Sequence, residues 1–247
     1  MWLIRSSIGR KLVMSITGVI LLLFLLFHLS MNVAAVFSAN AYNSICTLLG
    51  ANWYAVVATV VLVGIIVLHF FYAGMITIQN RMARGNDRYA INSRPKGVSW
   101  ASQNMFVIGA VILGFLVLHF SQFWYKMMFA ELMGHHEVSL CHGLMPFGHC
   151  EATPLTVSPQ DGATFISYYF SHLWVVITYL LWYTALWFHL THGVWSAFQT
   201  VGWNNQIWLK RLKMIGYIVA TLIFLGFAFV TLFFYAKSLC SSGGACC

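Results

Sequence analysis

Five long apolar runs without charged residues constrain this chain more than any other feature of its sequence. They cover residues 12–37, 54–78, 102–125, 165–201 and 214–236. Each run reaches the roughly 20 residues that a helix needs to cross a hydrocarbon core about 30 Å thick. Only 7% of the 247 residues are charged, whereas a soluble domain has about 25%. The sequence therefore predicts an all-α membrane protein with five transmembrane helices and no soluble domain.

The positions of the basic residues predict how these helices are oriented. All Lys and Arg residues except Lys126 and Lys237 lie before the first run, between the second and third runs, or just before the fifth run. Segments rich in Lys and Arg stay on the cytoplasmic side of a membrane. We therefore expect the N-terminus in the cytoplasm and the C-terminus outside. The basic segment 80–100 would then lie at the cytoplasmic surface, where a partner could dock.

The segment 126–164 is the one long loop expected on the outer side. It contains Cys141 and Cys150, and the outer compartment permits disulfides. A disulfide between these two cysteines is one prediction for the loop, although sequence alone does not fix the pairing. Zinc binding by the adjacent Cys–His pairs is less favoured, because the usual ligand spacing is missing.

Histidines inside four of the runs give the strongest indication of function, because an ionisable residue in a membrane-spanning helix is costly. Depth can be counted from the cytoplasmic helix ends at about 1.5 Å per residue. His28 and His119 lie at depths of roughly 26 and 28 Å. His69 and His192 lie at depths of roughly 18 and 16 Å. These matched depths predict two b-type haems, with His28 and His119 on the iron of the outer one. His69 and His192 would hold the iron of the inner one.

Two further histidines of the fourth run have weaker claims to a role as ligand. His189 lies one turn before His192 and is its rival, but His192 has the better depth, and Gly193 leaves room beside a haem ring. His172 lies near or beyond the outer surface. A single histidine in a membrane helix more often packs or forms hydrogen bonds, and we prefer this reading for His172 and His189. The sequence has no Cys-x-x-Cys-His, so covalent haem attachment is not expected.

Together these motifs resemble the single-chain cytochrome b subunit of succinate:menaquinone oxidoreductases and quinol:fumarate reductases, the type with five helices and two haems. The resemblance rests on TGVILLLFLLFH in the first run, on His69 and His119, and on HGVWSAFQTVGW at the end of the fourth run. It implies that the first four helices form a bundle around the haems, with the histidine before glycine, His192, as the last ligand. It also implies that Ser15 contacts a haem propionate.

The resemblance further implies partners, a substrate and a location. The partners are an iron–sulfur subunit and a flavoprotein subunit with FAD on the cytoplasmic side, and the location is the bacterial cytoplasmic membrane. The substrate is menaquinone or menaquinol, and the family includes both succinate oxidation and fumarate reduction. Two acids that some relatives have are missing: residues 47–54 contain none, and Leu190 occupies the other place. The candidate quinone-site residues are His172, His135, His136 and Glu137.

Two other functions remain possible from the sequence. One is a di-haem cytochrome b subunit of another membrane oxidoreductase, of the hydrogenase or formate dehydrogenase type, which would dock its partner on the outer side. The basic cytoplasmic segments favour docking on the inner side instead. The other is a transporter or metal-binding membrane protein without haem.

Overall fold

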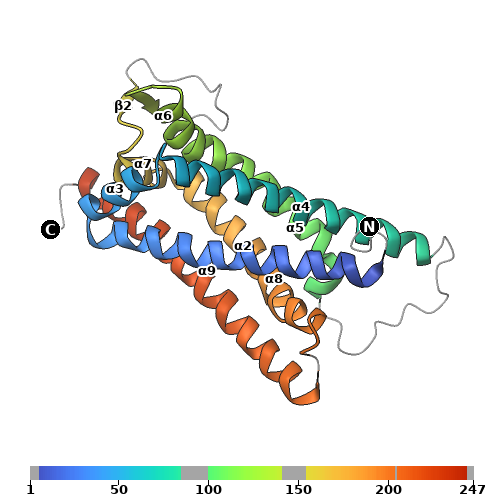
Figure 1. Ribbon diagram of the computed structural model, residues 1–247. Coiled ribbons are helices and arrows are strands. Elements are labelled where there is room, and N and C mark those ends of the chain that lie inside the picture. The colour runs from blue at the N-terminus through green and yellow to red at the C-terminus, as the bar shows by residue number, and fades with distance from the viewer. Residues whose placement is uncertain (1–5, 85–99, 141–153, 204, 244–247) are drawn as a thin grey trace. The chain divides into compact units, whose positions relative to one another are not determined.

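The computed structural model describes residues 6–84, 100–140, 154–203 and 205–243, and most of this length is helical (Figure 1). Among the described residues, five helical stretches are long and apolar enough to cross a membrane. They are α2 (Ser7–Phe37), α4 (Trp53–Arg84), the stretch Trp100–Leu132, α8 (Leu173–Thr200) and α9 (Gln206–Gly243). The prediction of five helices able to span a membrane is confirmed.

The third of these stretches changes its helix type along its length. It begins as α5 (Trp100–His119), continues as a π-helix, η1 (Phe120–Phe129), and ends as the single turn α6 (Ala130–Leu132). A π-helix is rare, and where one occurs it often marks a functional site. The change of type begins directly after His119, one of the predicted haem ligands.

The chain divides into two compact units, which are described separately. Unit 1 consists of Met1–Leu25, Val61–Val111 and Ala185–Leu222, and unit 2 of Leu26–Val60, Ile112–Thr184 and Ile223–Cys247. His69, His189 and His192 therefore belong to unit 1. His28, His119 and His172 belong to unit 2.

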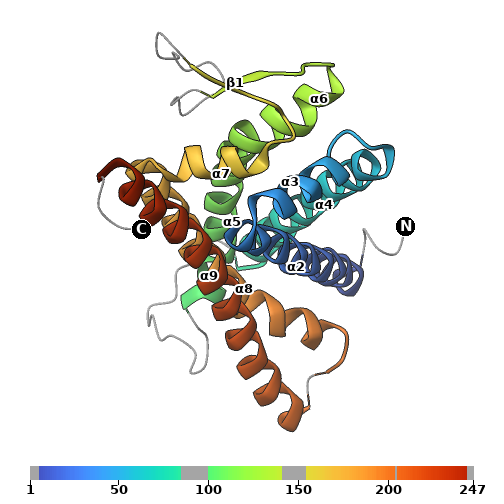
Figure 2. The ribbon, with the colours of Figure 1, turned by 90° about the vertical axis from the view of Figure 1, so that its left-hand side faces the viewer.

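The fourth apolar run, predicted as one helix over 165–201, is two helices in the structure. The short helix α7 (Gly162–Phe170) ends at Phe170, and α8 begins at Leu173. Asp161 caps α7: its carboxylate accepts hydrogen bonds from the backbone N–H and the hydroxyl of Thr164, at 3.3 and 2.6 Å. Such a cap satisfies N–H groups that the first helical turn leaves without partners. In unit 2, α7 lies beside α3 (Ala39–Leu48) (Figure 2).

Two segments between the predicted spans contain regular structure. The helix α3 lies in the first, between α2 and α4, and Ser38 caps it by accepting a hydrogen bond from the backbone N–H of Ala41. In the second, 126–164, the helix continues to Leu132 and two short strands follow. Strand β1 (Val138–Leu140) pairs antiparallel with β2 (Leu155–Val157). Cys141 and Cys150, and residues 85–99 of the basic segment, lie outside the described residues.

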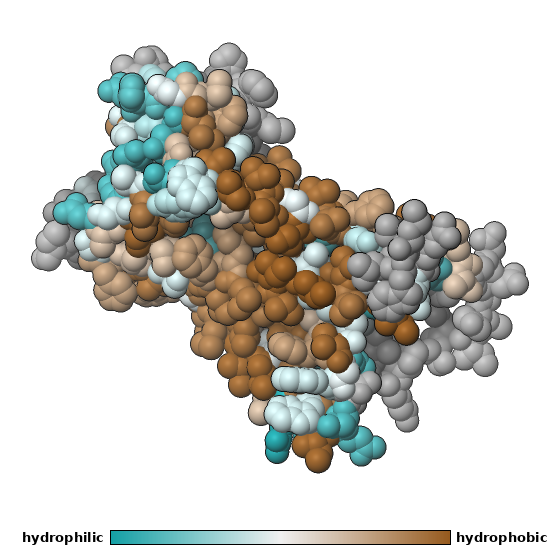
Figure 3. All heavy atoms as spheres, viewed as in Figure 1, coloured by the Kyte–Doolittle hydropathy of each residue, from teal (hydrophilic) through white to brown (hydrophobic). Residues whose placement is uncertain are grey.

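Apolar side chains are exposed along the spanning helices. Figure 3 shows hydrophobic residues over the helices and hydrophilic residues over the end that carries β2 and α6. Examples from the five stretches are Leu23 at 60%, Val67 at 61%, Val117 at 58%, Leu181 at 60% and Leu222 at 61%. Soluble monomers rarely expose large continuous apolar patches. These faces are therefore suited to contact with lipid.

Candidate metal centres

In unit 2, α2 and α5 bring the rings of His28 and His119 together. Their centroids are 5.8 Å apart, and the ring planes are nearly perpendicular, at 85°. Phe227 of α9 packs against His28 at 6.0 Å, and Trp182 of α8 packs against His119 at 5.4 Å. The pair that depth predicts for the outer haem is thus in contact, with aromatic rings around it.

In unit 1, the ring of His69 on α4 lies opposite His189 on α8. The ring centroids are 6.3 Å apart, at an angle of 66°. Small residues lie next to both rings: a Cβ atom on Gly18 would be 3.4 Å from Cε1 of His69, and one on Gly109 would be 3.7 Å from Cε1 of His189. Glycine at these two positions lets the helix backbones approach the imidazole rings closely.

His192, which the sequence favours as the partner of His69, has different neighbours. Its ring packs edge-on against Trp195, with centroids 4.9 Å apart. Within the described part of the chain, the histidine ring in contact with His69 is that of His189. The Nδ1 atoms of His189 and His192 are both buried, and neither has a hydrogen-bond partner among the described residues. His192 as a ligand stays a prediction, and the ring contact favours His189.

The chemistry of these pairs suits haem better than a bare metal ion. Transition metals such as zinc bind imidazole nitrogen at about 2.0–2.1 Å, which places the centroids of two opposite rings about 6 Å apart. Both ring pairs have this spacing, at 5.8 and 6.3 Å. A zinc site needs three or four protein ligands, and the described residues contain no group of three or more His, Cys, Asp or Glu side chains able to hold a metal. Haem takes its axial ligands from the protein, so a pair of histidines supplies the number of ligands that it needs.

One histidine of each pair lies at hydrogen-bonding distance from a hydroxyl group. Nδ1 of His69 is 2.9 Å from Oγ1 of Thr17, and Nδ1 of His119 is 3.2 Å from the hydroxyl of Tyr179. Tyr179 in turn donates to Oε1 of Gln122 in η1, at 2.8 Å. Gln122 is only 2% exposed, and its Nε2 has no partner among the described residues. Sequence reasoning missed these polar neighbours, since nothing in the pattern links them to the histidines.

Ser15, predicted to contact a haem propionate, is buried in unit 1 at 5% exposure. It lines a cavity of 300 Å³ whose other walls are apolar: Ile16, Val19, Ile20, Ala197, Phe198, Val201 and Trp203. Ser15 is therefore a polar residue on an otherwise apolar wall. Its contact with a propionate stays a prediction.

The four predicted quinone-site residues have unlike environments. His135, His136 and Glu137 are consecutive and exposed, directly after Gly134, whose φ is +78°. His172 is half-buried, and its Nδ1 lies 2.8 Å from the carbonyl oxygen of Tyr168 one turn earlier. The hydrogen bond of His172 fits the structural role that the sequence favours for it.

Glu131 is a polar residue to which the sequence analysis gave no role. Its Oε1 accepts a hydrogen bond from Nε2 of Gln160 at 2.7 Å, and its Oε2 accepts one from the backbone N–H of Ala51 at 3.1 Å. Gly50 is so close that a Cβ atom there would collide with the carboxylate. The structure thus brings an acid from α6 to the turn before α4, within the segment 47–54 that contains no acid of its own.

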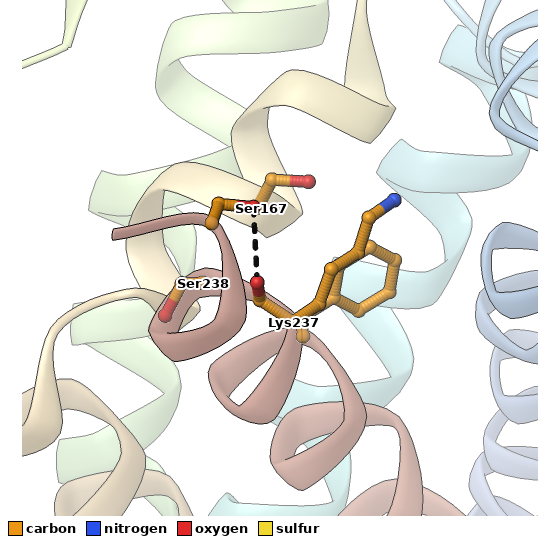
Figure 4. Close-up of a pocket in the computed structure, with 5 residues that line it drawn as sticks. Ser167, Lys237 and Ser238 are labelled. Atoms are coloured by element: carbon orange, nitrogen blue, oxygen red, sulfur yellow. Dashed lines mark hydrogen bonds between the residues drawn. The ribbon is translucent and has the colours of Figure 1, made fainter. Parts of the chain in front are cut away.

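A groove of 430 Å³ in unit 2 is lined by Ser167, Phe234, Lys237, Ser238 and Ser241. Figure 4 shows the ammonium group of Lys237 pointing away from Ser238. The hydroxyl of Ser167 donates to the carbonyl of Ala163, and that of Ser241 to the carbonyl of Lys237. These serine hydroxyls bond to carbonyls of their own helices, so the groove does not gather polar groups around one point.

Comparisons with protein-family models, with curated proteins and with solved structures find no match. The functional assignment therefore rests on the residues and the geometry described above.

Proposed function

We propose that this chain is the membrane-anchor, di-haem cytochrome b subunit of a succinate:menaquinone oxidoreductase or menaquinol:fumarate reductase. The observation that carries the proposal is the pair of ring contacts, at 5.8 Å between His28 and His119 and at 6.3 Å between His69 and His189. In each pair the two histidines come from different spanning helices. A bound haem would supply one-electron transfer between quinone and the partner subunits.

The residues of the chain would bind the two haems and keep water away from them. His28 and His119 would hold the outer iron. His69 and His189 would hold the inner iron, with His192 as the alternative to His189. Trp182 and Phe227 contact the outer pair of rings. Burial away from solvent in such apolar surroundings is one of the factors that set the reduction potential of a haem.

The proposed partners are an iron–sulfur subunit and a flavoprotein subunit with FAD on the cytoplasmic side of a bacterial membrane. Two features support this part of the proposal. The first is the resemblance carried by the first and fourth apolar runs. The second is the excess of basic residues in the segments expected at the cytoplasmic surface, which suits docking of a partner on that side.

The test is a reduced-minus-oxidised absorption spectrum of the purified protein, together with haem extraction. We expect the α-band of a b-type cytochrome and two haems per chain, released without covalent attachment. A preparation that binds no haem after expression with a haem supply would rule out this function and support the transporter alternative. Purification with an outer-side hydrogenase or formate dehydrogenase subunit would support the other cytochrome alternative.

We also propose that Glu131 accepts a proton from menaquinol near the outer haem. Quinol oxidation releases protons as well as electrons, and a carboxylate at the edge of the membrane can accept one. The hydrogen bonds from Gln160 and from the backbone of Ala51 hold this carboxylate in place. His172, His135, His136 and Glu137 remain the candidates that the sequence provides.

Replacing Glu131 with glutamine is expected to lower the turnover of a menaquinol analogue about 10²-fold, the lower end of the usual contribution of a general base. The amide has the same shape but cannot accept the proton. The measurement is steady-state quinol oxidation, with haem content as the check that the protein is intact. Glu131→Asp should recover part of the rate. Normal turnover in Glu131→Gln, together with a loss in Glu137→Gln, would assign the role to Glu137 instead.

A further inference from the structure

We infer that Thr17 and Tyr179 are positioning residues, which hold His69 and His119 in the one tautomer that leaves Nε2 free to bind iron. The inference rests on the proposed function, since it concerns residues that would act through the axial ligands. It comes from counting the protons that each hydroxyl has available. A neutral imidazole carries one N–H, and the hydrogen bond of one ring nitrogen decides which nitrogen carries it.

The hydroxyl proton of Thr17 is already in use. Its Oγ1 donates to the backbone carbonyl of Val13 at 2.8 Å, shared with that of Met14 at 3.1 Å. A threonine hydroxyl has a single proton but two acceptor lone pairs. At 2.9 Å from Nδ1 of His69, Oγ1 can therefore only accept. Nδ1 of His69 must carry the proton, and Nε2 keeps its lone pair.

The hydroxyl of Tyr179 is constrained in the same way by a different partner. It donates its proton to Oε1 of Gln122 at 2.8 Å. Its oxygen lies 3.2 Å from Nδ1 of His119, and it can only accept there. The amide of Gln122 is buried at 2% exposure, so no bulk water competes for the tyrosine proton. Two unrelated side chains thus impose the same tautomer on one histidine of each pair.

Such a hydrogen bond also changes the electronic properties of a ligand. A histidine that donates its second N–H becomes a more basic ligand with a fixed ring orientation, and loss of the acceptor typically costs about 10–100-fold in metal affinity. A more basic axial ligand favours ferric over ferrous iron. Thr17 and Tyr179 should therefore lower the midpoint potential of the haem that each supports.

The experiment measures the midpoint potentials of both haems in the purified protein by redox titration. The variants are Thr17→Val and Tyr179→Phe, which keep the shape of the side chain and remove the hydroxyl. We expect each to raise the potential of one haem, a different one in each variant. A tenfold change in the reduction equilibrium corresponds to about 59 mV for one electron. The low-spin ferric EPR signal of the same haem should move as well.

Matched variants separate this effect from a general change in packing. Tyr183→Phe removes a hydroxyl one turn along α8, which is bonded to Thr231 rather than to a histidine, and should leave both potentials unchanged. Thr17→Ser keeps a hydroxyl and should restore the potential. Gln122→Leu keeps Tyr179 but frees its proton to donate to His119, and should move the same haem as Tyr179→Phe.

The outcomes distinguish the two proposals. If the wild-type protein binds no haem, the proposed function fails and this inference fails with it. If the wild type has two haems and Thr17→Val and Tyr179→Phe titrate like Tyr183→Phe, only the inference is overturned. A third outcome is that Thr17→Val loses one haem that Thr17→Ser keeps, or that Tyr179→Phe loses one that the wild type keeps. In either case the hydroxyl is required for ligation and the inference stands.

Discussion

Replacing His119 with alanine is expected to leave the purified protein with one haem in place of two. His119 is in ring contact with His28, and the two are predicted at the same depth, so removal of either should abolish the same site. The measurement is the pyridine haemochrome count per chain, with size-exclusion chromatography in detergent to confirm that the protein is folded. His28→Ala should give the same count, and the double variant should also keep one haem.

His172→Ala is the matched control for this prediction. His172 is a histidine of the same unit, but its Nδ1 lies 2.8 Å from the carbonyl oxygen of Tyr168, and its replacement should leave two haems. Two haems in His119→Ala would remove the histidine pair of unit 2 as a haem site. No haem at all would show that the two sites do not fill independently.

Replacing His189 with alanine is expected to remove the other haem, whereas His192→Ala should keep both. The ring of His189 lies 6.3 Å from that of His69, while His192 packs against Trp195. This reverses the preference drawn from the sequence, which favoured His192 by depth and by the glycine after it. Haem counting decides between them: loss of a haem in His192→Ala and two haems in His189→Ala would show that the sequence preference was right.

The two histidine pairs show what a sequence can and cannot predict for a membrane protein. Depth in the membrane grows linearly with residue number, so the match between His28 and His119 could be counted. His189 and His192 differ by three residues, or about 4.5 Å in height, and their rings have different neighbours, His69 and Trp195. Which of the two rings meets His69 depends on how the neighbouring helices pack, and no count along one helix provides it.

The breaks between helices and the short elements were less predictable, for a related reason. A run of apolar residues does not reveal that the helix stops at Phe170, because both α7 and α8 are apolar. The hairpin β1–β2 has only three residues in each strand, too few for a periodic signal. The contact between Glu131 and Ala51 joins residues 80 positions apart, and only the fold brings them together.

The break before α8 has a consequence for the path of protons. Since α8 begins at Leu173, Tyr179 lies six residues, or about 9 Å, from the start of the helix. Tyr179 contacts His119, a proposed ligand of the outer haem. A quinol oxidised near that haem, as proposed, would release its protons close to the outer solution while its electrons move towards the inner haem. Each turnover would then separate charge across the membrane, and moving one charge costs about 2.3 kcal/mol per 100 mV. The membrane voltage would therefore act directly on the rate and the direction of the reaction.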